Sequence, residues 1–173
     1  MTAALSAQDA GCSDERGSDM PELNHLLIPH QDGDQVMALR SGGYAIYEDR
    51  LAISIETENV DPQGFPNVAH ICSFHHNVAD GLKSGDRFTC EGGMAAASAD
   101  DPEAVKAFGF FVFHAERLDL TWTVVDVAED RITVELSAIH DDINGDSSRV
   151  SERPTTGTFT LSAKDPDELW IPV

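Results

Sequence analysis

The stretch LDLTWTVVDVAEDRITVELSA, residues 118–138, decides the fold that this sequence predicts. A polar pair at Glu129-Asp130 divides it into two arms, and in each arm every second residue is apolar. These apolar residues are Leu118, Leu120, Trp122 and Val124, then Ile132, Val134, Leu136 and Ala138. Successive side chains of a strand point to opposite sides, so this period of two gives each arm one apolar face. The stretch therefore predicts a long antiparallel hairpin.

Shorter strand patterns flank this hairpin. Residues 51–55 alternate after a tight turn at 48–50, which predicts a second hairpin with 44–46 as its first arm. Further strands are expected at 67–77, 87–91, 109–114 and 156–162. Some seven short strands predict a mainly β fold, all-β or β-rich α+β, arranged as an antiparallel sandwich or a partly closed barrel. The pattern does not distinguish these two architectures.

Helix signals are confined to a few places. Asp101, Pro102 and Glu103 form an N-cap, a first helical position and a favourable dipole charge, and they predict one short helix that Gly109 ends after about two turns. A closing helical turn is expected over 165–170, with Trp170 covering one end of the sheet. For residues 21–28 both a helical turn and a strand remain open.

The length of 173 residues fits one domain that can bury a core without disulfides or a structural metal. Residues 1–20 mix Ala, Ser, Asp and Gly without a hydrophobic period, which predicts a disordered N-terminal tail. Residues 21–173 are expected to form a single β-rich domain.

The charge balance narrows the classes of partner. The chain has 31 acidic and 11 basic residues, a formal net charge of −20. The basic residues are scattered singly, so no basic stripe exists to neutralise phosphates, and we exclude direct nucleic-acid binding. An anionic membrane surface would repel the chain. So strong a negative field favours a basic protein or a cationic ligand; the alternative is that the acidic surface serves solubility alone.

The cysteines indicate a reducing compartment. An odd number, Cys12, Cys72 and Cys90, does not make a disulfide framework. The N-terminus has no apolar stretch typical of a signal peptide, and no run approaches the roughly twenty apolar residues that span a bilayer. We therefore expect a soluble cytoplasmic protein.

Residues 61–90 concentrate the side chains that could do chemistry, with three of the seven histidines and two of the three cysteines. His70 and Cys72 are two positions apart, so on a strand they share a face and lie about 6.5 Å apart. Zinc needs three or four ligands, which predicts a metal site of His70, Cys72 and His114, with Cys90 and His140 as alternative third ligands. A Cys-His nucleophile pair is a further reading. The alternative is that Cys72 is a buried small apolar residue.

A second pattern, Asp142, Asn144 and Asp146, places oxygen ligands at alternate positions, as the first half of a calcium loop does. Gly145 stands at the wrong position, and Arg153 occupies the twelfth position, where a calcium loop needs Glu. A polar turn explains the segment better.

These observations favour a non-catalytic, acidic binding domain for a basic protein or a cationic ligand, with no cofactor. The alternative is a zinc-type metal-binding protein or a hydrolase that uses His70 and Cys72 with a distant ligand. The oligomeric state does not follow from the sequence.

Overall fold

The computed structural model describes residues 22–30, 33–61, 63–64, 66–92, 106–111, 113–115, 117–141 and 153–169. This part of the chain forms ten β-strands. Their bounds are β1 His25–Ile28, β2 Gln35–Tyr47, β3 Arg50–Val60, β4 Pro66–Asn77, β5 Arg87–Cys90, β6 Lys106–Phe111, β7 Phe113–His114, β8 Leu118–Val127, β9 Arg131–His140 and β10 Thr155–Ser162. A 3-10 helix, η2, spans Pro166–Glu168 and is the closing helical turn that the sequence predicts.

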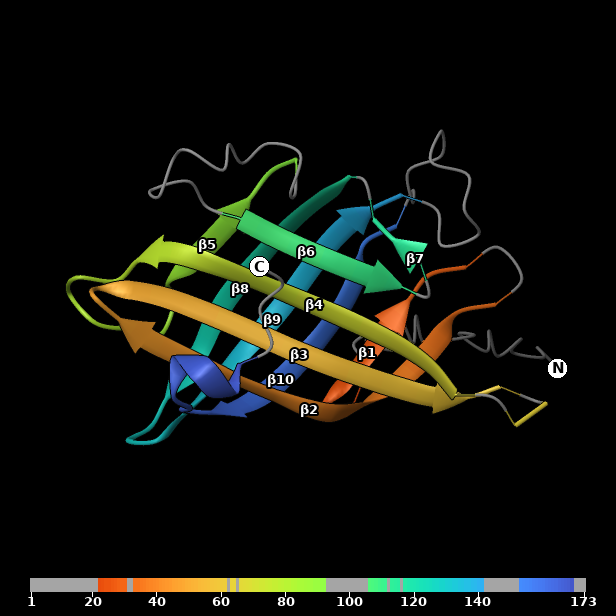
Figure 1. Ribbon diagram of the computed structural model, residues 1–173, viewed down its shortest axis with the longest axis horizontal. Helices are drawn as coiled ribbons and strands as arrows, with labels where there is room; N and C mark the ends of the chain where they lie inside the picture. The colour runs from red at the N-terminus through yellow and green to blue at the C-terminus, as the bar shows by residue number, and fades with distance from the viewer. Residues whose placement is uncertain are drawn as a thin grey trace, which may run out of the picture.

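The ten strands form one antiparallel sheet in the order β5-β8-β9-β10-β1-β2-β3-β4-β6-β7. In a flat sheet, β8 and β4 would lie about 29 Å apart, because six strand spacings of about 4.8 Å separate them. Instead, the Trp122 indole N–H of β8 donates a hydrogen bond to Ser73 Oγ of β4 over 3.0 Å. The sheet therefore curls into a nearly closed barrel (Figure 1). This confirms the expected mainly β fold and selects its barrel alternative.

The predicted hairpin at 118–138 is present as β8 and β9. Its apolar faces meet in register, with Trp122 opposite Leu136 and Val124 opposite Val134. All four side chains are buried, and Trp122 has no exposed surface. They pack inside the barrel with Phe159 of β10 and Leu26 of β1. The barrel interior is thus the hydrophobic core.

The hairpin of β2 and β3 is also confirmed, and its turn has an unusual backbone. Glu48 and Asp49 have φ values of 49° and 61°, both in the left-handed region. A two-residue turn of this hand matches the twist of the flanking strands. β2 begins at Gln35, well before the predicted arm, and a bulge near Leu39 and Ser41 interrupts its alternation. Because of this bulge, the residues before Gly42 do not continue the alternation of apolar and polar residues that predicts a strand.

The predicted helix from Asp101 is wrong for residues 106–108, which belong to strand β6. Residues 101–105 lie outside the described residues. Gly109 does not end a helix; it lies within the strand, opposite Ile71 of β4. A Cβ there would lie 2.8 Å from the Phe111 ring and 3.1 Å from Leu118 Cδ2. Glycine is needed at this position because the side chains approach the backbone so closely.

Within the segment 21–28, where a helical turn and a strand were both open, His25–Ile28 form strand β1. The predicted tail at 1–20, Trp170 and the acidic loop residues Asp142, Asn144 and Asp146 lie outside the described residues. In the described part of the chain, no helix has the length and apolar character that crossing a membrane requires.

Candidate functional site

Strand β4 changes its alternation partway along, and this determines where its chemically active side chains point. On β3, the core residues Leu51 and Ile53 pair with His76 and Ser73 of β4. Between these pairs one residue of β3 therefore faces two residues of β4, which is a β-bulge. As a result, Ser73 and His76 both point into the barrel. In a regular strand, residues three positions apart would point to opposite faces. The sequence pattern contains no signal for this bulge.

His70 and Cys72 lie on the opposite, outer face of β4, as the predicted pair requires. His70 Nε2 and Ser54 Oγ of β3 form a hydrogen bond of 3.0 Å, and the ring meets Phe108 edge-on at 6.5 Å between centroids. Burial lowers the pKa of His70, and the nearby Glu56 carboxylate partly opposes this shift. The imidazole is therefore held neutral near pH 7.

Cys72 is fully buried beside this histidine. Burial raises the pKa of its thiol to about 12, although a hydrogen bond with the Phe108 backbone acts in the other direction. Zinc binding and nucleophilic attack both require the thiolate. At neutral pH the side chain therefore behaves as a small apolar residue, which is the alternative reading of this position.

The proposed third ligands lie on different strands of the sheet. Cys90 and His140 point into the core, where His140 stacks on Phe111 at 3.8 Å. His114 is on β7, and its backbone pairs with Phe110, which in turn pairs with His70. Among the described residues, no group of three or more His, Cys, Asp or Glu side chains could hold a metal. The zinc site of His70, Cys72 and His114 stays a prediction.

A chain of polar contacts runs from the core toward one end of the barrel. Trp122 Nε1–H donates to Ser73 Oγ, and Ser73 Oγ lies 3.0 Å from His76 Nε2. Because its oxygen accepts the indole proton, the serine hydroxyl can donate its own proton to Nε2. The His76 ring then packs against Phe88 of β5, with centroids 5.3 Å apart and planes at 49°. Phe88 is thus supported from inside the barrel.

His140 occupies a separate polar position toward the far end of β9. Its Nδ1 lies 2.7 Å from the Asp141 backbone oxygen, and its Nε2 lies 2.8 Å from Thr155 Oγ1. Since a carbonyl oxygen only accepts, Nδ1 carries the proton and Nε2 of the neutral ring accepts from the hydroxyl. Both ring nitrogens are therefore used in the fold.

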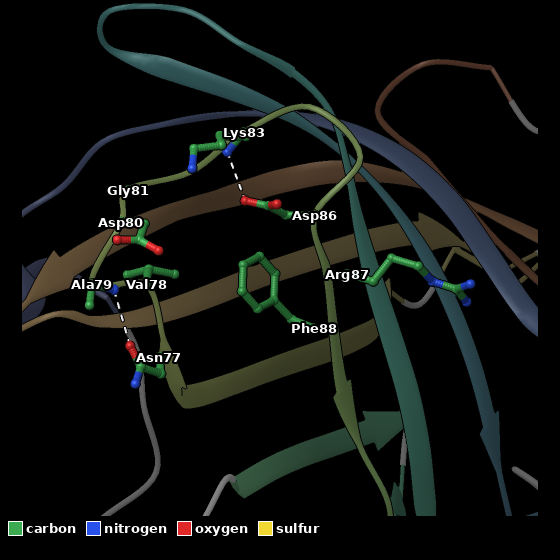
Figure 2. A pocket seen from close by; sticks show the side chains of 9 residues that line it. All are labelled: Asn77, Val78, Ala79, Asp80, Gly81, Lys83, Asp86, Arg87 and Phe88. Carbon is green, nitrogen blue, oxygen red and sulfur yellow. Dashed lines mark hydrogen bonds between the residues drawn. The ribbon is translucent and has the colours of Figure 1, made fainter.

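A groove of about 380 Å³ lies where β4 ends and β5 begins, and we call it the β4–β5 groove. Figure 2 shows the side chains that line it. They are Asn77, Val78, Ala79, Asp80, Gly81, Lys83, Asp86, Arg87 and Phe88. The volume is in the usual range of small-ligand sites. The groove is therefore the candidate binding site of the described structure.

Backbone hydrogen bonds hold the walls of the β4–β5 groove in place. Val78 N–H donates to the Asp49 carbonyl over 2.8 Å, and Gly81 N–H donates to the Val78 carbonyl over 2.7 Å. On the other wall, Gly85 N–H donates to the Val124 carbonyl, and Val124 N–H donates to the Asp86 carbonyl, both over 2.8 Å. One wall is thus tied to the β2–β3 turn and the other to β8, so the groove is formed without a ligand.

Charge is unevenly placed around the β4–β5 groove. In Figure 2 the side chains of Asp80 and Asp86 are on the same side of Phe88, whereas the Arg87 side chain extends away. Asp86 Oδ2 accepts a hydrogen bond of 2.8 Å from the Lys83 backbone N–H. The Lys83 side chain lies at the edge, or rim, of the groove. An aromatic ring with carboxylates beside it is an environment that attracts organic cations.

The sequence did not predict this site; it predicted only one of the turns that border the groove. The turn at 83–86 was predicted, and the Asn77 side chain, which accepts from Ala79 N–H over 3.0 Å, is a recognisable turn signal. The contact between His76 and Phe88 depends on the bulge that turns His76 inward, which the alternation does not reveal.

No protein-family model, no curated protein and no solved structure matches this chain.

Proposed function

We propose that this protein is a non-catalytic binding protein that receives a positively charged group of a basic protein in the β4–β5 groove. The observation that carries the proposal is the groove geometry, in which the Asp80 and Asp86 carboxylates and the Phe88 ring border one space while Arg87 points elsewhere. The net charge of −20 adds a long-range attraction for such a partner.

The fixed walls of the groove support this proposal. Binding orders little additional chain when the site is already formed, so less free energy is lost on association. Asp80 is exposed, and no hydrogen bond or ion pair to another described residue engages its carboxylate. A cation that docks there gains a charge partner without displacing one.

We also propose a cytoplasmic location. Cys72 and Cys90 are free, buried and on opposite faces of the sheet, an arrangement that suits a reducing compartment.

The test is the affinity of a short Lys- and Arg-containing peptide for groove variants, measured by isothermal titration calorimetry. Asp80→Asn should weaken binding by about twofold to fivefold, the range of an exposed charge pair. Glu129→Gln is the matched control, because it removes the same charge from an exposed turn on another hairpin. The proposal fails if both substitutions weaken binding equally.

Lys83→Gln gives a test of opposite sign. Removing this ammonium group from the rim should tighten the binding of a cationic peptide, whereas Arg131→Gln, an exposed charge at the start of β9, should change it little. Weaker peptide binding by Lys83→Gln would instead show that the lysine holds an anionic part of a ligand, and it would overturn the proposal.

A further inference from the structure

We infer that the group bound in the β4–β5 groove is the guanidinium of an arginine side chain, stacked on Phe88. This inference rests on the proposed function and specifies its ligand. The groove combines one aromatic face with carboxylates at its border. That combination distinguishes the two cationic side chains, because they use an aromatic ring and a carboxylate differently.

The Phe88 ring favours arginine over lysine. It is partly buried, and the His76 ring packs behind it at 5.3 Å between centroids. His76 is itself fixed by its 3.0 Å hydrogen bond to Ser73. A supported ring offers a flat surface of constant orientation. A planar guanidinium can stack on such a surface with both cation–π attraction and wide contact, whereas a tetrahedral ammonium touches it at one point.

The carboxylates beside the ring also favour arginine. A guanidinium that stacks on the ring directs its N–H donors outward in its own plane. Carboxylates at the border of the ring then accept these donors without loss of the stacking contact. Asp80 and Asp86 lie at this border, on the same side of Phe88 (Figure 2).

Desolvation also distinguishes the two cations, because the partly buried Phe88 ring is an aromatic surface among the residues that line the groove. A guanidinium is more weakly hydrated than an ammonium and loses less on contact with an aromatic ring. Lys83 on the rim disfavours every cation, so it does not favour lysine over arginine.

The experiment compares N-acetyl-arginine amide with N-acetyl-lysine amide as probes of the full-length protein, by chemical-shift titration of the amides of residues 77–88. The arginine probe should bind about fivefold more tightly than the lysine probe, as expected for a stacking contact of about 1 kcal/mol. Phe88→Leu should remove this preference by weakening the arginine probe alone. Phe74→Leu, an aromatic substitution on the outer face, is the matched control.

The outcomes separate the inference from the proposed function. Equal affinities, or a preference that persists in Phe88→Leu, would overturn the arginine inference while the groove remains a general cation site. If neither probe perturbs residues 77–88, both fall. Retained chemical shifts outside the groove would show that Phe88→Leu is folded.

Discussion

Trp122 shows how a single residue joins the two halves of the barrel. Its side chain has no exposed surface, and its indole N–H is paired with Ser73 Oγ. A buried N–H without a partner is costly, so the serine satisfies the polar end of a large apolar side chain. The residue therefore contributes to the core and also connects it to His76 and Phe88.

Replacing Trp122 tests this role. Trp122→Ala should reduce the free energy of unfolding by about 3–5 kcal/mol, because it leaves a large cavity. Ser73→Ala should cost about 1–3 kcal/mol through the unpaired indole N–H. Urea denaturation measures both. Val125→Ala on the same strand, where the side chain is 42% exposed, is the control and should cost little. A loss below about 1 kcal/mol for Trp122→Ala would contradict its place in the core.

His70 makes stability depend on pH. Burial lowers its pKa in the folded state below the unfolded value of about 6.5. The unfolded state therefore binds more protons as the pH falls through this range, and stability decreases until the folded-state pKa is passed. Urea denaturation at pH 7.5 and 5.5 should show this loss, and His70→Gln, which retains a hydrogen-bonding group near Ser54, should reduce it. An identical loss in both proteins would contradict the assignment.

For single residues, the sequence predicted which side chains share a face of a strand better than it predicted their chemical state. His70 and Cys72 do share one face of a strand, as their spacing indicates. The protonation of Cys72 could not be predicted, because its pKa depends on burial by neighbouring strands that the local sequence does not specify. The inward position of His76 depends on one extra residue in β4, and a bulge leaves no distinct mark in a run of mixed residues.

The turn between β2 and β3 has the backbone geometry of a tight hairpin turn, but its two residues adopt that geometry at a cost. Glu48 and Asp49 both adopt left-handed backbone angles, which residues with a Cβ adopt at a cost. Asn-Gly is the preferred pair for such a turn. The fold of the neighbouring strands therefore imposes this conformation on two acidic residues.

Replacing this turn with Glu48→Asn/Asp49→Gly should raise the free energy of unfolding by about 1 kcal/mol, since it relieves the left-handed strain. Thermal and urea denaturation measure the gain. The same replacement at Glu129 and Asp130 is the control, because neither residue has a positive φ. A comparable gain at both turns would show that strain at Glu48 and Asp49 is not the cause.

Elements with clean alternation were predicted well, and those defined by long-range packing were not. The β8–β9 and β2–β3 hairpins and β10 follow from a period of two. Asp101, Pro102 and Glu103 resemble a helix start, so the sequence pattern predicts a helix over part of strand β6. The requirement for glycine at 109 arises from Phe111 and Leu118, which only the folded barrel brings near it.

For the whole molecule, the sequence predicted a partly closed barrel as one of two architectures but could not choose between them. The choice depends on contacts across the interior, such as Trp122 with Ser73, that join residues 49 positions apart. The β4–β5 groove was equally hidden, because it forms where two strands and their turns meet at one end of that barrel. Net charge, by contrast, is additive along the chain, so the strong acidity on which the proposed basic partner rests follows from composition alone.

A net charge of −20 alone attracts basic peptides to the whole surface. Binding in the β4–β5 groove is therefore shown only by the location at which such a peptide binds. The most direct test is a ¹H–¹⁵N chemical-shift titration of the protein with an arginine-rich peptide at physiological ionic strength. We expect the amides of residues 77–88 to shift first and to approach saturation. Shifts that are spread evenly over the acidic surface, with none concentrated at the β4–β5 groove, would contradict it.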